Sequence, residues 1–191
     1  ELSHRTRNQL AALSSVIRYT STSAASVKTF ADKLDARIQA MGLTQSLLVE
    51  ADWTGVSLRD LIESHFQLCL PADVRTRLDG PRVVVAPEPA QNLGLAFHEF
   101  AQNVRQQNEG GERASVVRTM WAYDTETGSV VLSLREYLAD PKQRGTQIGF
   151  GTMMFRKVLP AALGIGAEAD VDYTSDGARA RITIPKACLA G

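Results

Sequence analysis

The sequence has few cysteines, no excess of charge of either sign and no long hydrophobic run. Only two of the 191 residues are cysteine, and Cys69 and Cys188 lie far apart without a CxxC or metal-binding spacing. This usage indicates reduced thiols and a reducing compartment, so we expect a cytoplasmic location. The 21 basic residues balance the 21 acidic ones, which argues against nucleic acid as a partner. No apolar run approaches the ~18 residues of a membrane helix, and no signal peptide is visible.

The remaining composition is that of a globular protein with one domain or two small ones. The hydrophobic fraction is 44% and the charged fraction is 22%, so the chain is able to form a core of useful size. The sequence begins inside a helical pattern, with no capping residue before it. We therefore expect a fragment whose upstream part is absent.

Residues 1–50 predict two amphipathic helices that form a hairpin. The first carries apolar residues at helical spacing, namely Leu2, Leu10, Leu13, Val16 and Ile17. Residues 20–23 supply the turn. The second carries an apolar stripe of Val27, Phe30, Leu34, Ile38, Met41 and Leu48, with charged residues such as Lys33 and Arg37 largely off it. Such a stripe needs a partner, either a second copy in a four-helix bundle or the rest of the same chain.

From residue 57 the pattern changes to mixed helices and strands. Residues 57–60 read Ser-Leu-Arg-Asp, a capping box that predicts a helix to about residue 68. Further helices are expected over 89–106 and 151–163, strands over 82–86, 115–123 and 129–135, a loop over 137–148, and a last hairpin of strands over 168–173 and 178–184. Adjacent antiparallel strands favour an α+β sandwich over a parallel sheet.

Two helical segments carry side chains suited to phosphate chemistry. His4 precedes Asn8 by one helical turn, and a neutral imidazole is a competent nucleophile toward a phosphoryl group. Glu99 and Asn103 share one face of the 89–106 helix, and carboxylate and amide oxygens suit Mg²⁺. Alone, each has a simpler reading, an exposed helical histidine in one case and an ordinary polar helix face in the other.

A glycine-containing segment and one carboxylate complete the candidate site. Gly149 and Gly151 precede a helix, where glycine permits close backbone approach and free N–H groups face phosphate. The segment is neither a Walker loop nor a dinucleotide-binding fingerprint. Glu136 ends a strand, where it is able to accept a hydrogen bond from an adenine amino group or is simply solvated.

In this order, these segments resemble the HWE-type sensor histidine kinases over nearly the whole chain. The family's Glu-Leu-x-His-Arg-x-Lys-Asn-x-Leu stands at residues 1–10, with Arg7 in place of the lysine. Its asparagine box stands at residues 98–104, and its Gly-Phe-Gly-Ser/Thr at residues 149–152. The resemblance implies a dimerisation and histidine phosphotransfer hairpin over residues 1–52. An ATP-binding α/β sandwich of the GHKL or Bergerat type would follow over residues 53–191.

The resemblance also implies an activity and its residues. His4 would accept the γ-phosphoryl group of ATP and pass it to an aspartate on a response regulator receiver domain. Glu99 would be a general base or orient water, and Asn103 would hold Mg²⁺. The implied nucleotide contacts are His98, Asn103, Glu136, Gly149, Gly151 and Thr152. Implied partners are a second copy of the chain, bound through the hairpin, and an upstream sensor domain.

Departures from the family pattern keep other functions open. Leu134 replaces the tryptophan of Trp-x-Glu, and residues 106–108 read Gln-Gln-Asn in place of Lys-Tyr-Gly. One alternative is a degenerate relative that relays phosphoryl groups or docks a regulator without ATP turnover. Another is a free-standing ATPase or chaperone of the same fold, which would leave the His4 hairpin without a purpose.

Overall fold

The structure, a computed structural model, describes residues 13–14, 16–21, 24–108, 115–138, 149–174 and 176–190. His4 and the rest of the segment at residues 1–12 lie outside the described residues, as does most of the loop expected at 137–148. None of the described helices combines the length and the apolar character that crossing a bilayer requires.

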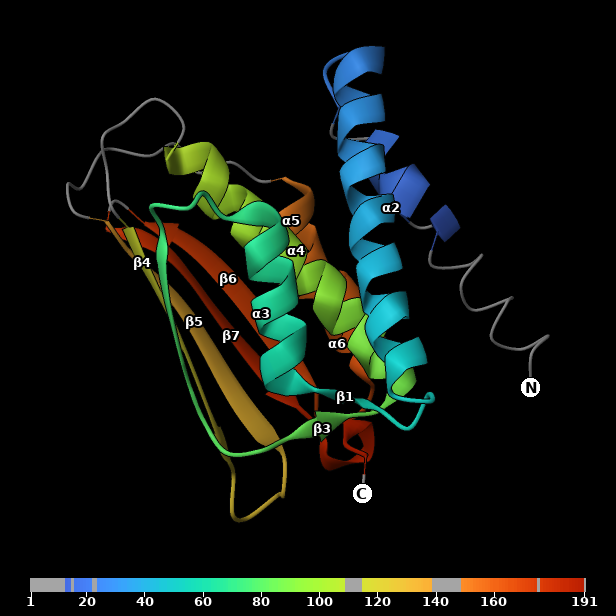
Figure 1. Cartoon of the computed structure of the whole chain (residues 1–191), viewed down its shortest axis with the longest axis vertical. Helices are drawn as coiled ribbons and strands as arrows, with labels where there is room; N and C mark the ends of the chain where they lie inside the picture. Colours follow the sequence, from blue (N-terminus) through green and yellow to red (C-terminus); the bar gives the residue numbers. More distant parts are fainter. Residues whose placement is uncertain are drawn as a thin grey trace.

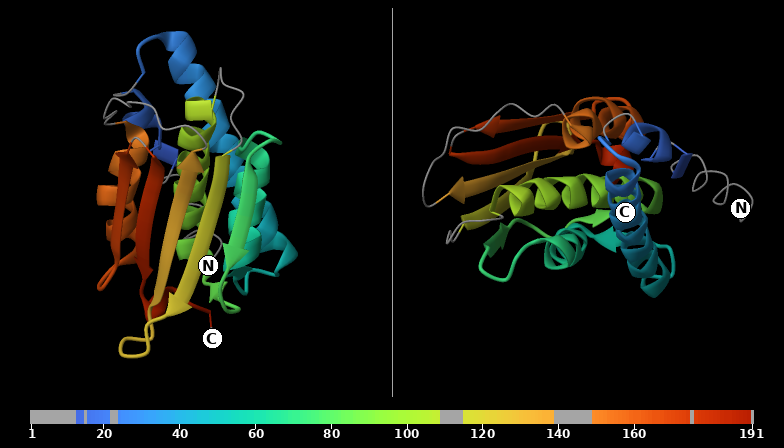
Figure 2. Two further views of the ribbon diagram at one scale, coloured as in Figure 1. Left: turned by 90° about the vertical axis from the view of Figure 1, so that its left-hand side faces the viewer. Right: turned by 90° about the horizontal axis from the view of Figure 1, so that it is seen from above.

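A five-stranded mixed sheet forms one layer, and helices cover one of its faces (Figure 1, Figure 2). Its strand order is β2-β4-β5-β7-β6. The strands are β2 (Arg75–Asp79), β4 (Ser115–Tyr123), β5 (Val130–Leu138), β6 (Glu168–Thr174) and β7 (Gly177–Ile184). The β4–β5, β5–β7 and β6–β7 pairs are antiparallel, whereas β2 runs parallel to β4. The hairpins β4–β5 and β6–β7 confirm the sequence prediction; β2 was not predicted.

Local signals set the ends of several elements. Ser57 caps α3 (Leu58–Cys69), and its hydroxyl accepts a hydrogen bond from the Asp60 amide at 3.4 Å, as the capping box predicts. Helix α4 (Pro87–Asn108) contains the predicted helix and begins at a proline, which is favoured at the first helical position. The two-residue strands β1 (Val56–Ser57) and β3 (Val84–Val85) pair beside these helix starts.

The helix predicted at 151–163 is three consecutive pieces. These are α5 (Phe150–Met153), a π-helical turn η1 (Met154–Val158) and α6 (Leu159–Leu163), and a short 3₁₀ turn η2 (Lys186–Cys188) follows β7. Pro160 lies just after the π-helical turn and has no N–H to donate, which disfavours a regular hydrogen-bond ladder through this segment. Wide turns of this kind inside helices are frequent at functional sites.

The core lies between the sheet and α3, α4 and α6. Phe97 and Phe100 of α4, Leu132 of β5, Ile182 of β7 and Phe155 are fully buried within it. Both cysteines are buried and free, as expected.

Helix α2 (Val27–Glu50) packs against α4 and α3, on the side away from the sheet (Figure 1). Ser26 caps it, and residues 16–21 form a helical segment before it. Residues 20 and 21 are therefore helical, where the sequence predicted the turn between the two helices.

The face of α2 that is buried differs from the predicted stripe. The buried residues are Arg37, Ala40, Thr44 and Leu48, whereas Val27 is 85% and Ile38 is 45% exposed. Only Leu48 of the stripe is fully buried, and it joins the core of the same chain. The homodimer and the domain boundary at residue 52 stay predictions.

Candidate functional site

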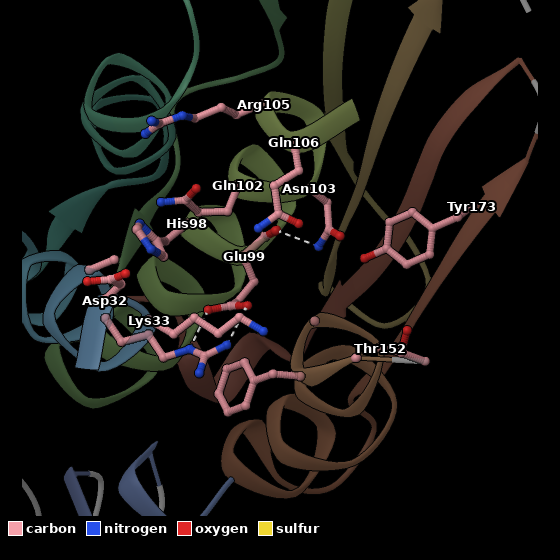
Figure 3. A pocket seen from close by; sticks show the side chains of 15 residues that line it. Asp32, Lys33, His98, Glu99, Gln102, Asn103, Arg105, Gln106, Thr152 and Tyr173 are labelled. Atoms are coloured by element: carbon pink, nitrogen blue, oxygen red, sulfur yellow. Dashed lines mark hydrogen bonds and ion pairs between the residues drawn. The ribbon is translucent and has the colours of Figure 1, made fainter. Parts of the chain in front are cut away.

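A cavity of about 380 Å³ opens between α2, α4, the start of α5 and β6 (Figure 3). Its size falls within the range of small-molecule sites. Six of the predicted site residues line it, namely His98, Glu99, Asn103, Gly149, Gly151 and Thr152. Residues far apart in the sequence therefore meet where the sequence predicted a phosphate-binding site. His4 lies outside the described residues.

Asn103 is oriented by its own helix. Its side-chain nitrogen donates a hydrogen bond to the Glu99 backbone carbonyl at 2.8 Å, one turn earlier on α4. With the nitrogen fixed in this way, the amide oxygen is the atom left for a ligand in the cavity. The predicted face-sharing of residues 99 and 103 is thus realised, although the contact uses the Glu99 backbone and not its carboxylate.

The Glu99 carboxylate is held by Arg37 of α2. The guanidinium donates two hydrogen bonds, from Nε to Oε1 at 2.7 Å and from Nη2 to Oε2 at 3.1 Å. Both side chains are more than nine-tenths buried. Arg37 also donates to the Thr20 hydroxyl at 2.7 Å and stacks 3.6 Å from the centre of the Phe150 ring. Arg37 therefore joins both helical segments of the N-terminal region to α4 and α5.

This ion pair changes what Glu99 is able to do in the arrangement seen. The bidentate arginine engages both oxygens of the carboxylate and fixes its orientation. Action as a general base, predicted for Glu99, requires that the pair loosen or that Glu99 act by orienting water.

His98 lies in a buried polar cluster between α3 and α4. Its Nδ1 is 3.0 Å from the Cys69 sulfur, and its ring meets the His65 ring edge-on. His65 in turn forms a hydrogen bond between its Nε2 and the Thr44 hydroxyl of α2 at 2.9 Å. Burial lowers the pKa of His98, as does Arg37, while Glu99 opposes the shift. Burial also lowers the pKa of His65 to about 3 and raises that of Cys69 to about 12. These groups are neutral near pH 7.

Gly151 leaves space for two polar side chains. A Cβ at this position would lie 2.8 Å from the Asn103 side-chain nitrogen and 3.1 Å from the Tyr173 hydroxyl. That hydroxyl is buried and has no hydrogen-bond partner among the residues that the structure describes. Burial raises the pKa of the Tyr173 phenol, with a further contribution from Glu99, so it is a neutral donor near pH 7. A buried donor of this kind at a cavity wall is suited to a ligand.

Glu136 is not among the described residues that line the cavity. Its side chain is buried within the sheet layer, and Oε2 accepts a hydrogen bond from the Ala178 amide at 3.1 Å. The alternative reading of Glu136 as a solvated strand end is wrong, because its side chain is buried. Its predicted contact with adenine stays a prediction.

The lining residues that the sequence analysis missed include Lys33, Arg37 and Tyr173. The sequence analysis placed Lys33 and Arg37 largely off the apolar stripe of this helix. The helical spacing of residues 33 and 37 was a signal that they share a face, but nothing local showed that this face is covered.

The residues present fit a magnesium nucleotide but not a metal held by protein alone. No group of three His, Cys, Asp or Glu side chains able to hold a metal occurs in the described part of the chain. Mg²⁺ is commonly bound by one or two protein oxygens together with substrate phosphates and water. The Asn103 oxygen, the space beside Gly151 and the Tyr173 hydroxyl match that kind of site.

Comparison with known proteins agrees with the resemblance indicated by the sequence motifs. Residues 1–82 match the HWE histidine kinase family. The chain is 29% identical over 191 residues to blue-light-activated histidine kinase 1 of Erythrobacter litoralis, covering 97% of this chain and 52% of that protein. It thus spans about half the length of that relative. The predicted resemblance to HWE histidine kinases is confirmed.

Solved structures confirm the fold. The structure of the Erythrobacter litoralis blue-light activated histidine kinase matches with a TM-score of 0.66 at 18% identity, over 97% of this chain and 57% of that one. The isolated histidine kinase domain of that protein matches with a TM-score of 0.62 at 19% identity, over 93% of this chain and 86% of that one. The arrangement of helices on a mixed sheet is therefore the GHKL-like fold of histidine kinase catalytic domains.

Proposed function

We propose that this chain is the core of a two-component sensor histidine kinase, which transfers the γ-phosphoryl group of ATP to His4. The group would then pass to an aspartate on a response regulator receiver domain. The observation that carries the proposal is the meeting of Glu99, Asn103 and the 149–152 segment in one cavity. The family match over residues 1–82, which includes His4, supports the proposed role of His4 as the phosphoacceptor.

The cavity residues divide the work of binding. The Asn103 amide oxygen is placed to be a Mg²⁺ ligand, and bound Mg²⁺ would neutralise charge on the phosphates. Gly149 and Gly151 let the backbone approach a phosphate at the start of α5, and Thr152 adds a hydroxyl there. Catalysis of phosphoryl transfer is mostly positioning and charge stabilisation, so a site of this kind needs little covalent chemistry of its own.

The test is incubation with γ-labelled ATP and Mg²⁺. We expect label on the protein that survives base and is lost in acid, the behaviour of phosphohistidine. His4→Gln should abolish labelling while leaving nucleotide affinity nearly unchanged. Label that persists in this variant, or that is acid-stable, contradicts the assignment of His4.

The second candidate is a relative without ATP turnover, and the Arg37–Glu99 pair favours it. With both carboxylate oxygens bound by arginine, the chain would relay phosphoryl groups or dock a regulator only. Nucleotide binding without phosphohistidine in the same experiment would decide for this candidate.

A further inference from the structure

Helix α2 forms one wall of the cavity and carries a cation into it. Lys33 and Arg37 of this helix both line the cavity, together with Asp32 and Ala36. Residues 33 and 37 are one helical turn apart, so the buried ion pair between Arg37 and Glu99 also fixes where Lys33 lies. In Figure 3 the Lys33 side chain extends into the cavity beside Glu99.

We propose that Lys33 binds the phosphates of the nucleotide, as a cation supplied to the ATP site by the helical hairpin. The proposal rests on the proposed function, because it names a further residue of the same site. It assigns Lys33 to substrate binding and Arg37 to positioning it.

The charges around the cavity single out Lys33. The cationic residues lining it are Lys33, Arg37 and Arg105. The Arg37 charge is balanced by Glu99 at 2.7 Å. The Arg105 side chain is exposed and, in Figure 3, extends away from Glu99 and Asn103. Lys33 extends into the cavity beside Glu99, which lies one helical turn before Asn103 on α4.

In the last turn of α4 the basic residue is Arg105, whose exposed side chain extends away from Glu99 and Asn103 in Figure 3. Residues 106–108 are Gln-Gln-Asn, and Gln106 lines the cavity. A triphosphate carries several negative charges, and Mg²⁺ neutralises only part of them. An ammonium group on a flexible stem is a common binder of phosphate, so Lys33 is chemically suited to contact the triphosphate.

One consequence is that nucleotide affinity depends on how α2 is docked. If the Arg37–Glu99 pair loosens, the part of α2 that carries Lys33 loses its buried charged contact with α4. The helical hairpin that carries the phosphoacceptor would then control binding at the ATP site directly.

The experiment compares four forms of the whole chain by calorimetric titration with Mg²⁺–ATP, alongside urea unfolding of each. They are wild type, Lys33→Gln, Lys33→Arg and, as a matched control, Lys28→Gln. Lys28 is an exposed lysine on the same helix and does not line the cavity. We expect Lys33→Gln to weaken binding about tenfold, in keeping with the loss of one charged hydrogen bond. Lys33→Arg and Lys28→Gln should stay close to wild type, and all four should unfold at similar urea concentrations.

The possible outcomes separate this proposal from the proposed function. Wild-type binding with unchanged affinity in Lys33→Gln overturns the role of Lys33 and leaves the kinase proposal standing. A loss that Lys28→Gln shares, or that accompanies an equal loss of stability, also overturns it. Absence of Mg²⁺–ATP binding by wild type overturns both.

Discussion

His98 and Glu99 follow one another on α4, yet the two side chains are stabilised in opposite ways. His98 belongs to a cluster with Cys69 and His65 that burial keeps neutral. Glu99 is equally buried but remains paired with a full positive charge on Arg37. A buried neutral cluster needs only hydrogen bonds and a close fit, whereas a buried charge needs a partner of opposite sign.

The difference assigns separate tasks to the two sides of α4. The His98 side joins α4 to α3 through neutral contacts with Cys69 and His65, although His98 also lines the cavity. The Glu99 side joins α4 to α2 across the cavity, so any change in that pair moves the cavity wall. The following predictions test this comparison, from the largest expected effect to the smallest.

Breaking the charged pair should have the largest effect on stability. Arg37→Met leaves Glu99 buried without a counter-charge, which we expect to lower the free energy of unfolding by about 3–5 kcal/mol in urea titrations. Glu63→Gln, which breaks the exposed Arg59–Glu63 pair, should change it by less than about 0.5 kcal/mol.

The double variant Arg37→Met/Glu99→Met sharpens this test. Removing both charges together should recover most of the loss, because no uncompensated charge remains. A double variant as unstable as the sum of the two single ones would show that Arg37 and Glu99 contribute independently, contrary to the ion pair described above.

In the neutral cluster around His65 and His98, close packing should decide how a substitution changes stability. A Cβ at Gly94 would overlap the Thr44 hydroxyl oxygen and lie 2.6 Å from His65 Nε2. Both neighbours are fully buried, so we expect Gly94→Ala to lower the free energy of unfolding by about 1–3 kcal/mol. Gly42→Ala is the matched control, because a Cβ there meets nothing within 4 Å. It should raise stability by up to about 1 kcal/mol through helix propensity, and equal effects at the two sites would contradict the packing argument.

The α+β fold was predicted more fully from the sequence than the α2 wall of the site. The Ser57 capping box, the α4 helix and the β4–β5 and β6–β7 hairpins all follow from local pattern. Strand β2 does not, because Leu78 is its only apolar residue and no alternation marks it. Its pairing with β4 depends on backbone contacts that leave no trace in the side chains.

The wall of the cavity was missed for a related reason. Arg37 looks like a surface charge in its own helix, and its partner lies 62 residues away. Burial of a charge is decided by such a distant partner and not by the amphipathic pattern around it. The face containing residues 99 and 103 was predictable because both lie on one helix, whereas Tyr173 approaches Gly151 only through tertiary packing.

Lowering the pH should weaken the neutral cluster selectively. Burial lowers the pKa of His65 from 6.5 to about 3 and lowers that of His98 in the same direction. Below pH 6.5 the unfolded chain therefore binds protons that the folded chain does not. The free energy of unfolding therefore has its full value above that pH. It falls as the pH decreases, by up to about 1.4 kcal/mol per pH unit for each histidine.

Urea midpoints measured between pH 7.5 and 5 check this slope before most carboxylates titrate. His65→Gln should show a smaller slope than wild type, because one group that resists protonation has been removed. An unchanged slope would mean that His65 takes up a proton in the folded state, and the cluster would not be neutral.

The smallest effect on stability is expected at Tyr173 of β6, which lines the cavity. Its buried hydroxyl has no partner among the described residues, so Tyr173→Phe removes a polar group without breaking a hydrogen bond. The free energy of unfolding should change by less than about 0.5 kcal/mol or rise slightly. Affinity for Mg²⁺–ATP should instead fall by roughly 2- to 10-fold, the loss of one neutral hydrogen bond to the ligand.

Tyr123→Phe provides the control, because that hydroxyl donates to the Arg82 carbonyl at 3.2 Å on the exposed surface and does not line the cavity. If Tyr173→Phe destabilises the chain and binds nucleotide as wild type does, the hydroxyl serves the fold and not the ligand.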